Sequence, residues 1–371
     1  MPPTKNIIVQ AAQVIVPCTD LTTSLDFFTG TLGFRVDLIF PADSPTTAVI
    51  SGHGVCLRLE QQAASVVADA RLELRLQCDD SISPTQLFGP DGVRVDLVTA
   101  QPVMVVPPGT QEFILTRNDV SAWGAGRAGM QYRDLIPGRL GGRFVASHIR
   151  VPNGGEVPDY VHFHRVRFQM IFCKAGWVRV VYEDQGPPFV MHAGDCVLQP
   201  PEIRHRVLEA SPGLEVIEIG CPAVHETVAD HALPLPTSQV QPGRTFSGQR
   251  FVRHIAAEAQ WRPWCICGLQ APGFEACDVG IAAATDGLAD VHIVKTPGPS
   301  ERRNAVSVAH SGELLFVFVL DGSLALEGDA TKPGAVHGHH QLRVGDCCVI
   351  PAGAPVILSS GDGLRMLTVA L

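Results

Sequence analysis

The chain has 371 residues, of which 46% are hydrophobic and 18% charged, and its formal net charge is −9 at pH 7. A chain of this length is expected to form two or three domains with sizeable cores. Binding to nucleic acid or to an anionic membrane is not expected, because both need concentrated positive charge and the sequence has no cluster of Lys and Arg.

Three further features describe the class of protein. No apolar stretch approaches the roughly 20 residues that a membrane span requires, and the N-terminal sequence lacks the pattern of a secretory signal. The 11 cysteines are odd in number and lie mostly in apolar runs, which is typical of reduced, buried thiols. We therefore expect a cytoplasmic protein. The close pair Cys265 and Cys267 has no second Cys or His pair near it, so it is not expected to bind metal.

Two Pro-rich stretches without helical periodicity, residues 101–109 and 234–243, are typical of linkers. They divide the chain into three blocks, at roughly 1–100, 109–232 and 244–371. In the first block, a strand is expected over residues 7–16. Asp20 is a candidate N-cap for the amphipathic stretch that follows, and further strands come after it. This order predicts a small α+β module.

The second and third blocks are copies of each other. Residues 133–154 align without gaps on residues 277–298, Gly176 falls on Gly322, and residues 194–200 fall on residues 345–351. The spacing changes only where turns are expected, which indicates a duplicated domain. Both copies contain short apolar runs bounded by Gly, such as residues 168–172, 177–182 and 314–320. Many short strands without helices predict a β-sandwich or β-barrel.

One group of polar residues in the second block has the spacing of a metal site. His162 and His164 point to the same face if they lie on a strand, with Cα atoms about 7 Å apart. A tight reversal at residues 165–167 would bring Gln169 back beside them, and His205 is expected to begin a later strand. Imidazoles at this separation can converge on one ion.

These residues resemble the two sequence motifs of the cupin superfamily. They read Gly155-x6-His162-x-His164-x4-Gln169-x6-Gly176 and Gly194-x5-Pro200-x-Glu202-x2-His205. The sequence departs from the family pattern at Gln169, where Glu is usual, and at Glu202, where Gly is usual. The resemblance covers about two-thirds of the chain and implies a bicupin, with tandem double-stranded β-helix (jelly-roll) barrels.

The resemblance implies that His162, His164, Gln169 and His205 hold one divalent metal ion, which could be Fe, Zn, Mn or Ni. Because all four ligands are neutral, the ion keeps its full charge, which weakens its binding but makes it a stronger Lewis acid. The equivalents in the third block are Val308, His310, Leu315 and Val356, so that copy is expected to be a structural barrel without metal. The histidines at positions 337, 339 and 340 lie outside the motif and are expected in a solvated loop.

The first block resembles the vicinal-oxygen-chelate (glyoxalase-like) superfamily, which implies a βαβββ module. The segments that carry this resemblance are residues 16–28, 32–34 and 88–97. Gln13 and Asp96 stand where that family usually has metal ligands, so we expect a degenerate, metal-free module used in packing or dimerisation. His53 is expected to be a polar residue at a strand end. The predicted fold is thus mainly β, with this module before the two cupin barrels.

Three functions remain open on the sequence. A metal-dependent dioxygenase acting on a small oxygen-rich or aromatic metabolite is the first. The second is an isomerase, cyclase or lyase acting on a sugar acid or an enolisable carbonyl, which needs a general base. The third is a non-catalytic, metal-stabilised binding protein. A small-molecule substrate is expected, and a homodimer is expected by analogy with the family. The candidate bases are Tyr160, Glu209 and Glu218, and the candidate anchors for a substrate carboxylate are Arg150 and Arg167.

Overall fold

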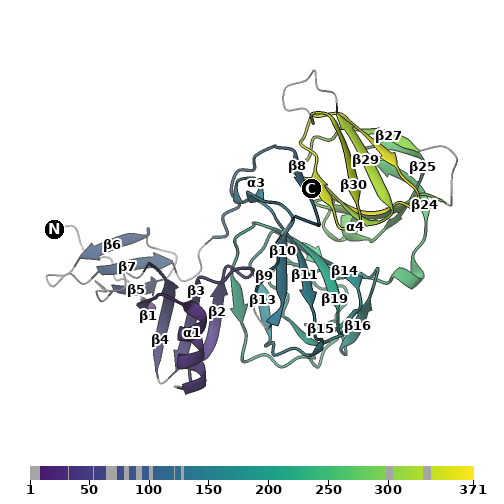
Figure 1. The fold of residues 1–371 in the computed structure, drawn as a ribbon. Helices are drawn as coiled ribbons and strands as arrows, with labels where there is room; N and C mark the ends of the chain where they lie inside the picture. Colours follow the sequence, from purple (N-terminus) through teal and green to yellow (C-terminus); the bar gives the residue numbers. More distant parts are fainter. Residues whose placement is uncertain are drawn as a thin grey trace. The chain divides into compact units, whose positions relative to one another are not determined.

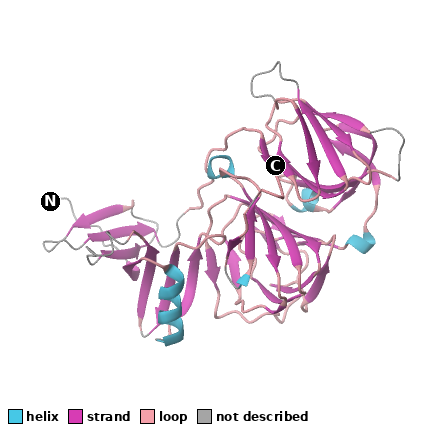
Figure 2. Cartoon of the chain, in the orientation of Figure 1, coloured by secondary structure: helices cyan, strands magenta, loops and turns pink. Residues whose placement is uncertain are grey.

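A computed structural model of the chain describes residues 9–31, 33–52, 54–63, 73–78, 83–88, 94–99, 103–120, 122–126, 129–297, 304–328 and 336–371. The predicted role of His53 therefore lies outside the described residues. Strands dominate the described part, as Figure 2 shows. The chain forms two compact units. The first holds residues 1–105, 160–165 and 225–233, and the second holds residues 106–159, 166–224 and 234–371.

The first unit begins with the order βαβββ. Its elements are β1 (Val9–Cys18), α1 (Leu21–Asp26), the π-helix η1 (Phe27–Thr31), β2 (Arg35–Phe40), β3 (Thr47–Gly52) and β4 (Val55–Gln61). The strands lie in the order β2-β3-β4-β1, and β1 runs parallel to β4. The predicted N-cap is confirmed, because Asp20 accepts a hydrogen bond from the backbone of Thr23 at 2.6 Å.

The same unit contains five more strands: β5 (Glu73–Cys78), β6 (Thr85–Phe88), β7 (Arg94–Thr99), β13 (His162–His164) and β20 (Thr227–Ala229). β5 pairs with β1 and with β7, and β6 pairs with β7. β13 pairs with β20, which also pairs with β2. A small core of buried residues stabilises this unit: Cys18, Leu21, Ala48, Ile50 and Leu59. The segment with two of the candidate metal ligands thus lies in a strand, as predicted.

In the second unit, the first copy forms two sheets (Figure 1). A seven-stranded sheet has the order β23-β17-β14-β19-β11-β10-β9. Its strands are β9 (Gly124–Ala125), β10 (Gln131–Asp134), β11 (Val145–Val151), β14 (Phe168–Ala175), β17 (Cys196–Leu198), β19 (Leu214–Cys221) and β23 (Val252–His254). The other strands are β12 (Gly155–Glu156), β15 (Trp177–Tyr182), β16 (Phe189–His192) and β18 (His205–Ala210), with β18 between β12 and β15.

The second copy repeats this plan. One sheet has the order β24-β25-β26-β33-β28-β31-β8, formed by β8 (Ile114–Thr116), β24 (Arg262–Ile266), β25 (Leu269–Asp278), β26 (Asp290–Lys295), β28 (Leu315–Asp321), β31 (Cys347–Val349) and β33 (Arg365–Ala370). The other has the order β27-β32-β29-β30, formed by β27 (Ala305–Val308), β29 (Ser323–Gly328), β30 (His339–Arg343) and β32 (Val356–Ser360). Short elements join them: β21 (Thr245–Phe246), β22 (Gln249–Arg250), α3 (Arg139–Gly142), α4 (Ile281–Ala284) and η3 (Ala256–Glu258).

The two copies exchange a strand. β8 lies near the start of the block 109–232 but pairs with β31 of the second copy, and β23 lies near the start of the block 244–371 but pairs with β17 of the first copy. Gly194-Asp195 in the first copy and Gly345-Asp346 in the second are equivalent pairs, and the aspartate of each pair binds an exchanged segment. Asp346 accepts from the backbone of Asn118 at 2.8 Å, and its equivalent Asp195 accepts from the backbone of Ala256 at 2.8 Å. Each copy therefore has one sheet that includes a short strand from the block of the other copy.

Strand alternation divides the side chains of the second unit between two environments. Phe168 and Phe172 of β14 share one central core with Phe316 and Phe318 of β28, so this core lies between the two copies. Gln169 is the residue next to Phe168 on β14, so its side chain points to the opposite face of the sheet, the interior of the first copy. The described cysteine side chains are free thiols. No helix in the described residues is long and apolar enough to cross a membrane.

Candidate metal centre

The imidazoles of His162 and His164 lie on β13 and are 1% and 7% exposed. Each has its Nδ1 atom engaged within the first unit. His162 Nδ1 lies 2.8 Å from the backbone oxygen of Tyr160, and His164 Nδ1 lies 3.1 Å from Oγ1 of Thr227. A carbonyl oxygen can only accept, so Nδ1 of His162 carries the proton and its Nε2 carries the lone pair. This is the tautomer that a metal ligand needs.

His205 is the first residue of β18 and is 5% exposed. Its Nδ1 lies 3.0 Å from the backbone oxygen of Ile203, which fixes the same tautomer as in His162. The ring of Tyr182 stacks on the imidazole, with ring centroids 5.5 Å apart. These contacts fix the ring in the tautomer whose Nε2 carries the lone pair.

His162, His164 and His205 each offer a ring nitrogen, and these three nitrogens lie within 4.8 Å of one another. Imidazole nitrogens bind divalent ions at about 2.0–2.1 Å, which places two such nitrogens about 3–4 Å apart. The three buried histidines are therefore a candidate metal-binding group, and the chemistry of their nitrogens fits a divalent ion of the Fe, Zn, Mn or Ni class.

Gln169 was predicted as the fourth ligand. Its Nε2 donates to Oε1 of Glu218 at 2.7 Å. Because a carboxylate can only accept, this contact fixes which end of the amide is nitrogen. The amide oxygen, the atom that can bind a metal, accepts from Nε2 of Gln199 at 3.2 Å. These contacts fit a neutral oxygen ligand, and the ligand role of Gln169 stays a prediction.

Gln199 is a residue that sequence reasoning missed. Its Nε2 donates to the oxygen of Gln169 and also lies 3.4 Å from Nε2 of His205, so one amide group faces two candidate ligand atoms. The phenol of Tyr182 donates to Oε1 of Gln199 at 2.7 Å. Burial raises the pKa of Tyr182, so the phenol keeps its proton for this bond. The only available signal was that Gln199 stands beside Pro200 in the second motif.

The three candidate bases lie in different surroundings. The ring of Tyr160 meets the ring of His162 edge-on, with centroids 5.9 Å apart. Glu218 contacts Gln169, as described above. Glu209 instead forms an ion pair with Arg179 at 3.1 Å, and both side chains are about 40% exposed. The structure thus brings Tyr160 and Glu218 next to candidate ligands, while Glu209 pairs with a strand neighbour. Their roles as bases stay predictions.

The two candidate substrate anchors already have partners. Arg150 stacks over the ring of Trp123 at 4.0 Å and donates to Oε1 of Gln131 at 2.6 Å. Arg167 donates to Oε2 of Glu313 at 2.7 Å.

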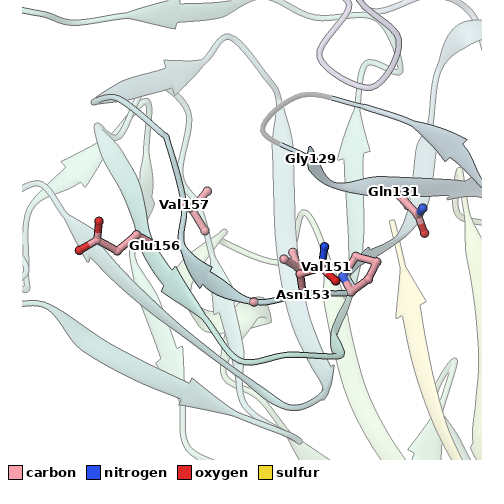
Figure 3. A pocket seen from close by; sticks show the side chains of 8 residues that line it. Gly129, Gln131, Val151, Asn153, Glu156 and Val157 are labelled. Carbon is pink, nitrogen blue, oxygen red and sulfur yellow. The ribbon is translucent and has the colours of Figure 1, made fainter.

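The first copy contains a cavity of about 380 Å³ (Figure 3). It is lined by Gly129, Gln131, Val151, Pro152, Asn153, Gly154, Glu156 and Val157. None of the candidate site residues is among those that line it.

The second copy differs at the equivalent positions. Val308, Leu315 and Val356 are at most 1% exposed and belong to the apolar core of that barrel. His310 uses its Nε2 to bond the backbone oxygen of Ile350 at 2.7 Å. Among the described residues, the other group that could hold a metal is Asp278, Asp290 and His292, whose two carboxylates are exposed.

The remaining polar residues singled out in the sequence lie elsewhere. In the first unit, Gln13 is buried and its Oε1 has no hydrogen-bond partner, while Asp96 is half-buried on β7. The predicted loop histidines form a local contact, in which Nε2 of His340 meets the backbone oxygen of His337 at 2.9 Å. His340 and its neighbour lie at the start of β30, not in a loop, because Gln341 and the residues around it pair with β29.

Comparison with known proteins relates the fold to solved structures. No protein-family model matches the chain, and no curated protein matches its sequence. The oxalate decarboxylase of Lactobacillus farciminis, in its formate complex, is similar with a TM-score of 0.50 and 12% identity, over 71% of this chain and 89% of that one. A mutant of Bacillus subtilis oxalate decarboxylase is similar with a TM-score of 0.50 and 14% identity, over 73% and 80%. At this identity the likeness shows the fold, which is mainly β and cupin-like.

Proposed function

We propose that the chain is a metal-dependent enzyme in which His162, His164, Gln169 and His205 hold a single divalent ion. The observation that carries the proposal is the group of three buried imidazoles whose ring nitrogens lie within 4.8 Å. Two of these rings donate from Nδ1 to backbone carbonyls, at 2.8 and 3.0 Å, so that Nε2 carries the lone pair, as in a metal ligand. The ion would supply Lewis-acid or redox chemistry to a bound substrate.

The reaction we propose is oxygenation of a small oxygen-rich or aromatic metabolite. The ligand set is neutral, and most of the contacts described around it are hydrogen bonds to backbone oxygens or to buried side chains. Tyr182 and Gln199 form a chain of such bonds that ends on Gln169 and His205. In this proposal these residues orient the candidate ligands, as outer hydrogen-bond partners of metal ligands do.

A metal-dependent lyase or isomerase is the second candidate. It is supported by Glu218, a half-buried carboxylate that lies 2.7 Å from the amide of Gln169 and is placed to take up a proton. The fold is also shared with two proteins named oxalate decarboxylases. In this reaction Glu218 would exchange Gln169 for the substrate as its hydrogen-bond partner.

The test separates these reactions by their need for oxygen. The purified chain is loaded with Fe(II), Mn(II), Zn(II) or Ni(II) and mixed with diketones or catecholic acids in an oxygen electrode. Parallel samples under nitrogen receive oxalate or an enolisable sugar acid, and products are followed by mass spectrometry. The matched control is the double variant His162→Ala/His164→Ala, which keeps every residue outside β13.

We expect oxygen uptake that depends on Fe(II) and is lost in the double variant. Turnover under nitrogen, also lost in the double variant, would favour the lyase or isomerase instead. If no substrate reacts but metal raises the melting temperature of the wild type alone, the chain is a metal-stabilised binding protein. Oxygen uptake that persists in the double variant would contradict the proposed site.

A further inference from the structure

Arg167 lies in the short turn before β14, two residues before Gln169, and three different groups hold it. Its guanidinium donates from Nη1 to Oε2 of Glu313 at 2.7 Å. Its backbone nitrogen donates to the carbonyl oxygen of Cys221 at 2.7 Å. Its own carbonyl oxygen accepts from Nε2 of Gln249 at 2.6 Å. The side chain and both backbone polar groups are therefore fixed, which restricts the start of the strand that carries Gln169.

Glu313 belongs to the second copy, where it lies just before β28. Arg167 is nine residues before Gly176, and Glu313 is nine residues before Gly322, the equivalent glycine. The ion pair thus joins equivalent positions of the two copies. In an assembly of two identical copies, like charges would meet at such a position. The duplicated chain instead has opposite charges there, which makes the contact attractive.

A second arginine of the first copy binds the same carboxylate. Arg143 places Nε at 2.9 Å and Nη2 at 2.6 Å from Oε2 of Glu313. Burial alone would raise the pKa of Glu313, but the hydrogen bonds from Arg167 and Arg143 lower it, so the carboxylate is charged. Arg143 follows α3, far along the chain from the short turn before β14 that holds Arg167. It shares the partner of Arg167 without bordering a candidate ligand, and it is therefore a natural control.

We infer that Glu313, in the copy without the ligand set, is a positioning residue for the metal centre of the other copy. It fixes Arg167 and, through it, the backbone position of Gln169. The inference rests on the proposed function, because it assumes that Gln169 is a ligand. It gives the second barrel a role in the site: its contribution is a carboxylate that holds one ligand strand in place.

The test compares three single variants: Arg167→Gln, Glu313→Gln and Arg143→Gln. Each variant removes one member of the ion-pair cluster formed by Arg143, Arg167 and Glu313, so all three variants are expected to have a lower melting temperature. Arg167→Lys is included because it keeps the charge but loses the geometry of the guanidinium. Two readouts are measured on the full chain. One is the Kd for Co²⁺, taken from its visible absorption. The other is hydrogen exchange of the backbone amides from residue 165 to 170 in metal-free protein.

We expect the Kd for Co²⁺ to rise about tenfold or more in Arg167→Gln and Glu313→Gln, as when outer partners of metal ligands are removed. Arg143→Gln should change it less than twofold, and Arg167→Lys should fall between. Amide exchange over residues 165–170 should accelerate in the first two variants only. If Arg143→Gln weakens Co²⁺ binding and accelerates exchange as much as Arg167→Gln, the cluster merely joins the barrels and the inference is overturned.

The same data distinguish a failure of the proposed function. If the wild type binds Co²⁺ no more tightly than the His162→Ala/His164→Ala variant, the proposed metal site is wrong. The exchange data then still decide the positioning role of Glu313. Equal exchange rates over residues 165–170 in Glu313→Gln and the wild type would overturn it, and faster exchange in Glu313→Gln would support it.

Discussion

At the scale of single residues, the site depends on hydrogen bonds that choose one atom of each ligand. Two imidazoles donate from Nδ1 to backbone carbonyls, at Tyr160 and Ile203, and so present Nε2. The amide of Gln169 is oriented by Glu218, which can only accept. Neither constraint can be read from motif spacing, because spacing gives the residue type and not its tautomer or its orientation.

Replacing Glu218 with Gln tests this orientation. A glutamine at 218 can donate as well as accept, so the amide of Gln169 loses the contact that fixes which of its ends is the oxygen. We expect the metal Kd to rise about tenfold. The matched control is Glu209→Gln, which removes a carboxylate from the Arg179 pair on β18. Metal titration of both variants by calorimetry checks the prediction, and an equal effect of the two changes would contradict it.

A second residue-scale prediction concerns pH. Burial lowers the pKa of His148, which accepts from Arg133 at 2.9 Å and lies 2.8 Å from Glu215. The hydrogen bond from His148 and the pair with Lys174 lower the pKa of Glu215 to about 2, although burial opposes the shift. The folded state therefore resists protonating His148 below its ordinary pKa of 6.5, and resists protonating Glu215 below its ordinary pKa of 4.5.

The unfolded state takes up these protons first, so the free energy of unfolding should fall as pH falls. His148 contributes a loss below about pH 6.5, and Glu215 contributes a further loss between about pH 4.5 and 2. Urea unfolding of the wild type and of Glu215→Gln checks the prediction. The excess stability of the wild type should be present at pH 7 and should shrink below pH 4.5. An excess that stays constant down to pH 2 would show that Glu215 is not involved.

At the scale of elements, strand alternation explains how one chain segment serves two environments. On β14, Phe168 and Phe172 enter the core between the copies, while Gln169 faces the first barrel. On β28, the equivalent strand, Phe316 faces the same central core, and Leu315 takes the place of Gln169 in an apolar interior. The period of two was readable from the sequence, but the existence of a shared central core was not, because it depends on how two distant copies pack.

The turn after β14 makes an element-scale prediction. Gly176 has φ +72°, and a Cβ there would collide with Oγ of Ser211 and approach the backbone of Leu214. Gly213 has φ +71°, but nothing lies within 4 Å of its added Cβ. We expect Gly213→Ala to cost about 1 kcal/mol from the backbone conformation alone, and Gly176→Ala to cost clearly more. Chemical denaturation measures both, and equal losses would contradict the steric account.

At the scale of the whole molecule, the duplication and the β-rich fold followed from the sequence, because repeated Gly, Asp and Pro positions mark the same turns in both copies. The strand exchange did not follow. β8 and β23 are three residues each, and their partners β31 and β17 belong to the other copy. The three histidines were predicted from their spacing together with the resemblance to the cupin motifs, whereas Gln199 was missed because it stands next to a motif position and not on one. The glyoxalase-like ancestry of the first block and the homodimer stay predictions.

The most direct measurement is the metal content and affinity of the purified chain beside the His162→Ala/His164→Ala variant. Elemental analysis after dialysis, followed by titration of each protein with Co²⁺, gives both values. The account predicts about one bound divalent ion per wild-type chain and a loss of binding of a hundredfold or more in the variant, because two of the ligands are gone. Equal metal content in the two proteins, or none in either after loading with metal, would contradict it.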